Sequence, residues 1–359
     1  MNYLITGGSG FIGSALIRFL VKNKNNKILN VDKLTYASNN ESIFEISKNK
    51  NYNFVKADIC DKEIILKLIF DFKPNVVMHL AAESHVDRSI DDPLEFINTN
   101  ILGTSILLEC FKNYWINSLK KNKDNFFCFH HISTDEVYGS LDVSGKFRED
   151  TPYDPSSPYS ASKASADHLV RAWNKTYKLP IIITNCSNNY GPFQFPEKLI
   201  PTLILNALEG KKLPIYGDGS QVRDWLYVED HVAALYKVIT KGKIGETYNI
   251  GGNSELKNIE VANVICEILD NLIPESKKPL EIKKKSFKSL ITFVEDRPGH
   301  DKRYAIDINK IKKNLGWEPT FNFKDGMHKT VEWYLNNKFW CDRVQTKNFQ
   351  RQRLGIFKI

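Results

Sequence analysis

The stretch Gly7-Gly8-Ser9-Gly10-Phe11-Ile12-Gly13 follows the apolar run Tyr3-Leu4-Ile5 at the start of the chain. A short strand, then glycines at this spacing, then an amphipathic helix to about Lys22 is the pattern of a dinucleotide-binding turn. Gly7 and Gly10 permit a tight turn and let the backbone approach a pyrophosphate. Gly13 lets the helix pack closely on the strand, so that the first helical amides face the phosphates.

The second apolar run, Lys27–Val31, ends in Asp32. A carboxylate at this place accepts hydrogen bonds from a ribose diol and repels a 2′-phosphate. The pattern therefore indicates NAD rather than NADP. The alternative is that Asp32 is a helix cap or an ordinary loop acid.

Length and composition set the general class of the protein. With 359 residues, the chain exceeds one average domain, which favours two modules that share a cleft. Its 42% hydrophobic and 26% charged residues are ordinary for a soluble globular protein. No apolar run approaches the ~18 residues of a membrane span, and a strand at the very start leaves no room for a signal peptide. We expect a cytoplasmic protein that makes no membrane contact.

The cysteines and the charge indicate neither a metal nor a nucleic acid. The six cysteines are scattered and form no C-x-x-C pair, so we expect no disulfide and no metal site. The net charge of +8 comes largely from lysines between residues 277 and 288 and from the tail Arg343–Lys358. No aromatic residues alternate with arginines as in nucleic-acid-binding surfaces. A lysine-rich solvated surface is the simpler interpretation, and it is compatible with an anionic nucleotide diphosphate.

The first half of the chain alternates short apolar strands with helical stretches. These strands are too apolar to have a wet face, which predicts a parallel sheet covered on both sides by helices. With right-handed crossovers, this is a doubly wound α/β sheet of the Rossmann type. The expected strands are Tyr3–Thr6, Lys27–Val31, Asn53–Lys56, Val76–Leu80, Phe126–Ile132 and Ile181–Asn185; the expected helices are Phe11–Lys22, Asp61–Phe72, Pro93–Lys120 and Tyr159–Tyr177.

After about Cys186 the pattern changes to a smaller α/β module. We expect an NAD-binding domain at residues 1–186, and at 187–359 mainly a substrate domain, some segments of which return to the first domain. Four prolines break the chain here: Pro192, Pro196, Pro201 and Pro214. The expected short strands are Leu213–Tyr216, Thr247–Ile250 and Leu280–Ile282; the expected helices are Val228–Ile239, Ile259–Leu272 and Lys324–Leu335. Leu119–Asn125 is predicted to be a polar loop or helix end.

Tyr159 and Lys163 are the first candidate catalytic pair. They lie at the start of a predicted helix, and their four-residue spacing puts both side chains on one face. A lysine cation ~4 Å away, at an effective dielectric constant of ~20, favours tyrosinate by about 4 kcal/mol, an upper estimate because burial opposes it. A tyrosinate beside NAD⁺ can take the proton of a sugar hydroxyl while a hydride leaves the carbon. The alternative is a packing tyrosine next to a solvated lysine.

The triplet Thr134-Asp135-Glu136 directly follows a buried strand. Ligands bind at the carboxyl ends of such strands. Two adjoining carboxyl groups can separate their pKa values, so that one stays protonated as an acid while the other acts as a base. The alternative is a capped turn with solvated acids. His130 and His131, just before the triplet, are interpreted as structural residues.

These motifs resemble the extended short-chain dehydrogenase/reductases, and among them the nucleotide-sugar 4,6-dehydratases, over nearly the whole chain. The triplet is the most specific motif, because related epimerases lack both acids and related decarboxylases and GDP-sugar dehydratases typically keep only the glutamate. The chain departs from the pattern at Phe193, where the family often has tyrosine, and in its basic tail. The other segments that carry the resemblance are Thr6–Gly8, Asp32–Ala37, Ala57–Ile59, His79–Ser89, Asn185–Pro192, Pro196–Pro201, Arg223–His231, Asp296–Asp301 and Arg303–Ala305.

The resemblance implies a mechanism in deoxysugar biosynthesis, including that of rhamnose. Tyr159, assisted by Thr134 and Lys163, would oxidise dTDP-glucose at C4 with bound NAD⁺. Glu136 would then remove the C5 proton and Asp135 would protonate the departing C6 hydroxyl. The hydride would return to C6, giving dTDP-4-keto-6-deoxyglucose, regenerated NAD⁺ and no net redox change. The enzyme would thus be a hydro-lyase, and the family pattern also implies a homodimer.

The resemblance also implies two sets of binding residues. From the residues alone, Arg223 and Arg297 suit a pyrophosphate, although Arg223 could instead pair with Asp224, and Asn258 could be a helix cap. The implied cofactor-binding residues are Gly7, Gly10, Phe11, Ile12, Gly13, Asp32, Lys33, Thr35, Asp58, Ile59, Leu80, Ala81, Ala82, Ser84, Thr99, Tyr159 and Lys163. The implied substrate-binding residues are Ser84, Thr134, Asn188, Lys198, Leu199, Pro214, Tyr216, Arg223, Asn258, Arg297, His300 and Tyr304.

Two other functions stay open at this stage. Another enzyme of the superfamily, an epimerase or decarboxylase, would share the glycine turn and the Tyr159–Lys163 pair, but Asp135 and Glu136 argue against it. A non-catalytic NAD-binding regulator would have little reason to keep all four of these side chains together. The nucleotide dTDP rests wholly on the resemblance.

Overall fold

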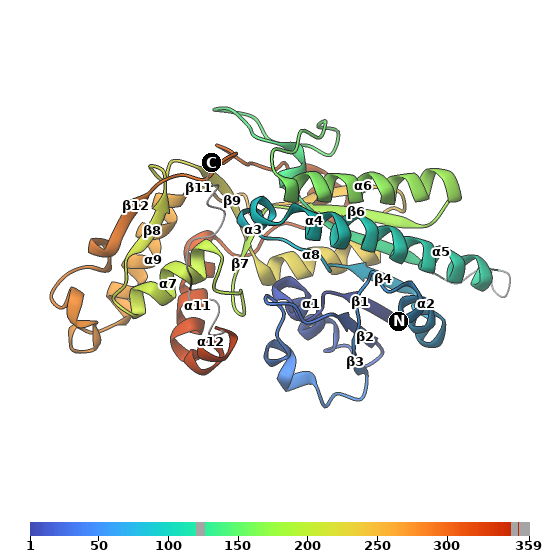
Figure 1. Cartoon of the computed structure of the whole chain (residues 1–359), viewed down its shortest axis with the longest axis horizontal. Coiled ribbons are helices and arrows are strands. Elements are labelled where there is room, and N and C mark those ends of the chain that lie inside the picture. Colours follow the sequence, from blue (N-terminus) through green and yellow to red (C-terminus); the bar gives the residue numbers. More distant parts are fainter. Residues whose placement is uncertain (120–125, 346–350, 352–359) are drawn as a thin grey trace.

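The computed structural model of the protein describes residues 1–119, 126–345 and 351. Residues 120–125 of the predicted polar loop and most of the basic tail lie outside these ranges. A large sheet with helices on both sides lies beside a smaller group of strands and helices (Figure 1).

The large sheet has seven strands, all parallel, in the order β10-β6-β5-β4-β1-β2-β3. The predicted doubly wound α/β sheet is therefore confirmed. The chain builds outward from β1 to β3 and then from β4 in the opposite direction, so the strand order reverses between β1 and β4. Ligands of such sheets bind at this switch point, beyond the carboxyl ends of the strands. The strands are β1 (Asn2–Thr6), β2 (Lys27–Asp32), β3 (Tyr52–Lys56), β4 (Val76–His79), β5 (Cys128–Thr134), β6 (Ile181–Cys186) and β10 (Thr247–Ile250).

Both faces of the sheet are buried, because successive side chains of a strand point to opposite sides. In β1, Tyr3 and Ile5 pack in one core, which also contains residues of α1 (Phe11–Leu20) and α8 (Val228–Lys241). Leu4 packs in the other core with α2, α5 and α6. This two-sided burial explains why the strands read as continuous apolar runs. The helices of the second face are α2 (Lys62–Phe72), α5 (Thr104–Leu119) and α6 (Pro158–Tyr177).

The predicted continuous helix over Pro93–Lys120 is wrong. The segment consists of α4 (Pro93–Phe96), a π-helical turn η2 (Ile97–Gly103) and then α5. Within the π-helical turn, the Asn100 side chain accepts a hydrogen bond from the Glu83 amide at 2.9 Å and donates one to the Ser162 hydroxyl at 2.8 Å. These bonds tie the turn to α6 and to the loop after β4, and wide turns of this kind are frequent at functional sites.

The smaller module contains a sheet of three strands, β11-β9-β7, and a parallel pair, β12-β8. Its core lies between α7, α9 and α11. The strands are β7 (Asn188–Tyr190), β8 (Leu213–Tyr216), β9 (Val222–Tyr227), β11 (Glu255–Lys257) and β12 (Ile291–Val294), and the helices are α7 (Leu199–Leu208), α9 (Asn258–Leu272), α11 (Phe323–Asn336) and α12 (Lys338–Val344). Helix α10 (Asn309–Leu315) instead packs against β10 of the large sheet and against α8. The remaining short elements are α3 (Val86–Asp91), η1 (Asn40–Ile46), η3 (Asp135–Tyr138), η4 (Glu275–Lys277), η5 (Leu280–Ile282) and η6 (Phe287–Leu290).

Two local predictions in this half need correction. Leu280–Ile282 is a 3₁₀ turn rather than a strand, and Leu280 is 81% exposed. Pro201 does not break the chain, because it lies in the first turn of α7, where amide groups have no acceptor within the helix. Thr247–Ile250 is a strand, as expected, and its pairing with β6 makes it one of the segments that return to the large sheet.

Candidate active site

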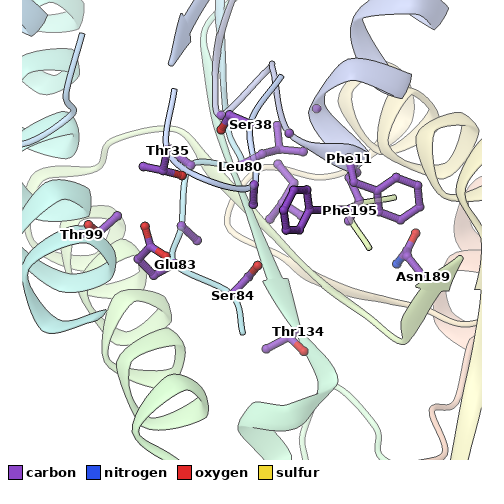
Figure 2. Close-up of a pocket in the computed structure, with 18 of the residues that line it drawn as sticks. Phe11, Thr35, Ser38, Leu80, Glu83, Ser84, Thr99, Thr134, Asn189 and Phe195 are labelled. Atoms are coloured by element: carbon purple, nitrogen blue, oxygen red, sulfur yellow. The ribbon is translucent and has the colours of Figure 1, made fainter. Parts of the chain in front are cut away.

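Two cavities adjoin along the carboxyl ends of the large sheet. The first lies over β1 and the glycine turn, and the second extends between α3 and the smaller module. Figure 2 shows the first cavity, with Leu80, Phe11 and Phe195 on one side and Thr134 at its lower end. Both cavities are lined by the same five residues where they meet: Ser84, Glu136, Asn188, Glu197 and Lys198.

The glycine turn forms one wall of the first cavity. Gly7 has a φ of +71°, and a Cβ atom there would lie 2.6 Å from the Ala81 nitrogen. A Cβ atom on Gly13 would lie 2.2 Å from the Gly7 carbonyl oxygen, which is far inside van der Waals contact. Only glycine fits at these two positions: Gly7 has a left-handed backbone and touches the loop after β4, and Gly13 lies where helix α1 begins directly against the turn. The first amides of α1 therefore border the cavity, as a site for phosphate groups requires.

Asp32 combines a structural role with its place in the cavity wall. Its carboxylate accepts hydrogen bonds from the amides of Ser9 (3.0 Å) and Leu34 (2.8 Å). Asp32 therefore does stabilise the adjoining loops, which is the alternative role that the sequence left open. Asp32 also lines the first cavity, and a carboxylate oxygen has a second lone pair with which to accept a ribose hydroxyl.

Every residue that the sequence comparison suggested for the cofactor lines the first cavity. At the end beyond Asp32, the Lys33 ammonium lies 2.9 Å from Glu95 and 3.5 Å from Asp58. Thr99 reaches the cavity from the π-helical turn (Figure 2). Sequence reasoning did not select several further lining residues, although some lie inside motifs that it quoted: Tyr36, Ala37, Ser38, Glu83, Cys186, Asn189, Gln194, Phe195 and Glu197.

The Thr134-Asp135-Glu136 triplet lies where the two cavities meet. Thr134 is the last residue of β5, and its hydroxyl accepts a hydrogen bond from the Glu136 amide at 3.3 Å. This bond caps the short helix η3, so the turn holds both acids at the end of the strand. The Asp135 side chain is buried, and its Oδ2 has no hydrogen-bond partner among the described residues.

The two acids have different electrostatic environments. Burial raises the pKa of Asp135 well above its ordinary value, and the Glu136 charge adds to this effect. Burial also raises the pKa of Glu136, but Arg297, Lys198 and Arg223 oppose that rise. Asp135 is therefore the group that holds a proton, and Glu136 is the group that cations keep closer to its charged form. The solvated turn considered as an alternative is not what the structure contains.

Tyr159 and Lys163 lie beside the triplet in the first turns of α6. The helix begins with a capping box formed by Ser157 and Ser160, which fixes its start. The Lys163 ammonium donates a hydrogen bond to the Ile132 carbonyl at 2.9 Å. Burial and then the Glu136 charge raise the pKa of Tyr159 well above its ordinary value, although a hydrogen bond to Thr134 opposes the rise.

This result corrects the sequence-based estimate for Tyr159. We expected the lysine charge to lower the tyrosine pKa, but burial and the neighbouring carboxylate outweigh that attraction in the chain by itself. An additional positive charge in the cavity would favour the tyrosinate at this place.

Nearly all of the residues suggested for the substrate line the second cavity or its junction with the first. Arg297 pairs with Asp87 at 2.7 Å, yet its buried Nε has no partner among the described residues. Arg223 donates only to the carbonyl oxygens of Val222 (2.8 Å) and Asp301 (2.9 Å), so the hydrogen bonds described for it leave its charge unpaired. The predicted substrate-binding residues in the second cavity are Ser84, Asn188, Lys198, Leu199, Pro214, Tyr216, Arg223, Asn258, Arg297 and His300, and Thr134 lines the first.

Tyr304 does not line either cavity. It is 2% exposed, its hydroxyl donates to Asp301, and its ring lies 4.2 Å from the Arg223 guanidinium. It therefore supports Arg223 from behind instead of facing a ligand. The Arg223 guanidinium lies over the face of the Tyr304 ring, and this cation–π contact orients the guanidinium.

Two alternatives were left open by the sequence: an ion pair between Arg223 and Asp224, and Asn258 as a helix cap. Asp224 accepts hydrogen bonds from the amides of Gly252 (3.0 Å) and Ser254 (2.7 Å) rather than pairing with Arg223. Asn258 is the first residue of α9, and the preceding Lys257 occupies the cap position. Neither alternative role is realised here.

All six cysteines are free thiols. In residues 1–119, 126–345 and 351, no group of His, Cys, Asp and Glu side chains is arranged to hold a metal ion. Within the same ranges, no helix has the length and apolar character needed to span a bilayer. His130 and His131 are completely buried in β5.

The parallel sheet, the glycine turn and the Tyr159–Lys163 pair together define an extended short-chain dehydrogenase/reductase. The family model described as GDP-mannose 4,6 dehydratase matches residues 4–330. A dTDP-glucose 4,6-dehydratase of Escherichia coli strain K12 is 58% identical over 359 residues, which cover 98% of this chain and 97% of that protein. The chain belongs to the dTDP-glucose 4,6-dehydratase family.

Solved structures agree with this family. A dTDP-glucose 4,6-dehydratase from Bacillus anthracis, in complex with NAD, has a TM-score of 0.83 at 44% identity. One from Streptomyces venezuelae, also with NAD bound, has a TM-score of 0.86 at 39% identity. Each comparison covers 96% of this chain and 100% of the other.

Proposed function

We propose that this chain converts dTDP-glucose to dTDP-4-keto-6-deoxyglucose by eliminating water, with NAD⁺ as a cofactor that is regenerated in each turnover. The product is a 6-deoxysugar nucleotide, which places the reaction in deoxysugar biosynthesis. The observation that carries the proposal is the pair Asp135–Glu136 beside Tyr159, where the two cavities meet. A sugar at this junction would have a base, an acid and a second base within one enclosed space.

The first cavity suits NAD⁺. The cradle of Gly7 and Gly13, which a Cβ atom would fill, admits a pyrophosphate, and Asp32 suits an unphosphorylated ribose. Asp58 and Ile59 would flank the adenine, and Leu80, Ala81 and Ala82 would line the path to the junction. When bound, NAD⁺ would supply a hydride acceptor and a positive charge next to Tyr159, and that charge would oppose the rise of the Tyr159 pKa.

The side chains of this protein then move three protons. Tyr159 takes the proton of the C4 hydroxyl, assisted by Thr134 and Lys163. Glu136 takes the proton from C5, which the new C4 ketone makes acidic, and Asp135 gives its proton to the departing C6 hydroxyl. Water leaves, and one proton returns to C5 as the hydride returns to C6. The raised pKa of Asp135 fits an acid, and the cations around Glu136 fit a base.

The second cavity suits a nucleotide diphosphate. It is bordered by the Nε of Arg297, which has no hydrogen-bond partner among the described residues, and by Arg223, whose described hydrogen bonds go to carbonyl oxygens. Lys198 adds a third cation. Planar guanidinium groups match phosphate oxygens. The preference for dTDP over other nucleotides follows the relatives and stays a proposal.

A mass measurement tests the function directly. The purified protein would be incubated with dTDP-glucose and, in parallel, with UDP- and GDP-sugars. Loss of the mass of one water from dTDP-glucose, without net NADH formation, is the expected result. An unchanged mass with an altered sugar configuration would instead indicate an epimerase, and no change with any sugar would indicate a binding protein.

Two further expectations stay proposals. A homodimer through the segment from α4 to α5 is supported by the exposed apolar side chains of Leu94 in α4, Ile97 and Leu102 in η2, and Ile116 in α5. Light scattering of the wild type and of Leu102→Glu tests it. The cytoplasmic location rests on the sequence, and cell fractionation tests it.

A further inference from the structure

A buried carboxylate lies on the same helix as the Tyr159–Lys163 pair. Asp167 follows Lys163 by four residues in α6, just as Lys163 follows Tyr159, so the three side chains share one face of the helix. Tyr159 and Lys163 line the first cavity, but Asp167 does not. Its side chain is 0% exposed.

Asp167 is held by neighbours from two strands and a loop. Its Oδ2 accepts hydrogen bonds from the Tyr153 hydroxyl at 2.7 Å and from the Asn185 amide at 3.2 Å. Its Oδ1 lies 3.2 Å from Nε2 of His131. The same Asn185 amide also donates to the Thr134 carbonyl at 3.1 Å. Asp167 is therefore connected through one side chain to the strand end that carries the catalytic triplet.

The carboxylate is charged, although it is fully buried. Burial alone would raise the pKa of Asp167, but contact with His131 and the charge of Lys163 hold it below its ordinary value. His131 does not balance that charge at neutral pH, because burial and the charge of Lys163 lower its pKa to about 4. Arg171 donates to the Tyr153 hydroxyl at 2.7 Å instead of to the carboxylate. The titratable groups that interact electrostatically with Asp167 or with Lys163 include Tyr138, Tyr153, His79, His131 and Cys186, and Arg171 acts on Tyr138, Tyr153 and His131 of this set.

Lys163 must keep its proton although it is buried. Burial lowers the pKa of Lys163, and Asp167 is the first group that opposes this loss. Its ammonium has one described hydrogen bond, to the Ile132 carbonyl. A neutral amine at this position could not stabilise a tyrosinate, so a negative charge near Lys163 would favour its part in the reaction.

We infer that Asp167 is a positioning residue of the reaction: its carboxylate keeps the Lys163 ammonium charged and, through Asn185, fixes the end of β5. The inference rests on the proposed function, because it assigns Lys163 its role there. Asp167 touches neither cavity, so it acts only through its neighbours. A purely structural carboxylate would stabilise the fold without affecting how the activity depends on pH.

The test compares kcat against pH for the wild type and Asp167→Asn, both with bound NAD⁺ and with dTDP-glucose. Without the anion, Lys163 loses its proton at lower pH and Tyr159 becomes harder to ionise. The acid limb should therefore move up by at least one pH unit and the basic limb down, with kcat at pH 7 reduced about tenfold or more. KM for the sugar nucleotide and the NAD content should change less than twofold.

Two variants separate charge from packing. Tyr153→Phe removes a hydrogen bond from the same carboxylate but leaves its charge, so both limbs should stay at the wild-type pH. Asp167→Glu keeps the charge, and it decides the question if Asp167→Asn does not fold: its limbs should also stay in place. Equal losses of kcat at every pH in Asp167→Asn and Tyr153→Phe, or displaced limbs in Asp167→Glu, would overturn the inference. A wild type without dehydratase activity would instead overturn the proposed function.

Discussion

Replacement of Glu136 by glutamine separates the first half of the proposed reaction from the second. The substitution keeps the size of the side chain, and the backbone amide bond to Thr134 is unaffected. A glutamine cannot take a proton from C5, but it leaves Tyr159 and the cofactor cavity intact. We expect oxidation at C4 to continue and elimination of water to stop.

The magnitude follows from the role of the lost carboxylate. A positioned general base contributes about 10²–10⁴-fold in rate, or about 3–5 kcal/mol of activation free energy. Glu136 is also, after burial, the largest cause of the raised pKa of Tyr159. Its neutralisation should therefore lower the pKa of that tyrosine, and C4 oxidation should extend to lower pH than in the wild type.

A single-turnover assay measures both effects. The reduced nicotinamide would be followed by absorbance, and exchange of the C5 hydrogen would be followed by mass in deuterated water. The variant should accumulate reduced cofactor and show almost no exchange. Glu149→Gln is a matched control, because Glu149 accepts the Asn249 amide outside both cavities and a glutamine oxygen can still do so. Wild-type rates of exchange and elimination in Glu136→Gln would refute the reasoning.

Three other perturbations test separate parts of the molecule. In Gly13→Ala, a Cβ atom 2.2 Å from the Gly7 oxygen should displace the start of α1 and weaken NAD binding by about tenfold to a hundredfold, measured by titration calorimetry. In Arg88→Ala, loss of the 3.0 Å pair with the buried Glu197 and of the contact with Tyr36 should speed NAD dissociation about tenfold, measured by exchange with labelled NAD. His231 has a pKa lowered by burial from 6.5 to about 3. Between pH 7 and pH 4 only the unfolded chain takes up this proton, so His231 should lower the free energy of unfolding by about 3 kcal/mol over that range. Urea unfolding of His231→Gln should show a smaller decrease of this free energy than the wild type.

Each of these predictions has a control or a contrary outcome. Gly10→Ala should be much milder than Gly13→Ala, since its nearest atom would lie 3.3 Å away. Arg148→Ala removes an exposed ion pair and should leave NAD release unchanged, so equal rates in the two arginine variants would contradict the role of Arg88. For His231, equal pH dependence in variant and wild type would show that its burial does not contribute.

The sequence was informative wherever local chemistry determines structure. The glycine turn, the apolar strands of the large sheet and the helix that carries Tyr159 and Lys163 all depend on neighbouring residues, so their pattern is visible along the chain. The triplet at the end of β5 could be placed because a polar cluster after a buried strand has few other positions to occupy. Most residues of the first cavity, such as Asp58, Leu80 and Thr99, were listed from the resemblance to the family and not from a local pattern.

Errors arose where distant contacts decide the outcome. The run Leu280–Ile282 reads as a strand, but the actual partner of β8 is β12, Ile291–Val294, which long-range pairing selects. The π-helical turn before α5 depends on Asn100 bonding to Glu83 and Ser162, far away in sequence. Likewise, the estimate for Tyr159 included Lys163 on the same helix and the opposing effect of burial, but not the charge of Glu136 from the end of β5.

The place of β10 in the large sheet has a consequence for biosynthesis. Thr247–Ile250 pairs with Ile183–Cys186, so the outer edge of β6 stays open until some sixty further residues have left the ribosome. Uncovered sheet edges invite pairing with other chains. A nascent chain stalled after β6, or a fragment that ends there, should therefore bind chaperones or aggregate instead of folding alone. The smaller module thus determines when the larger one is finished.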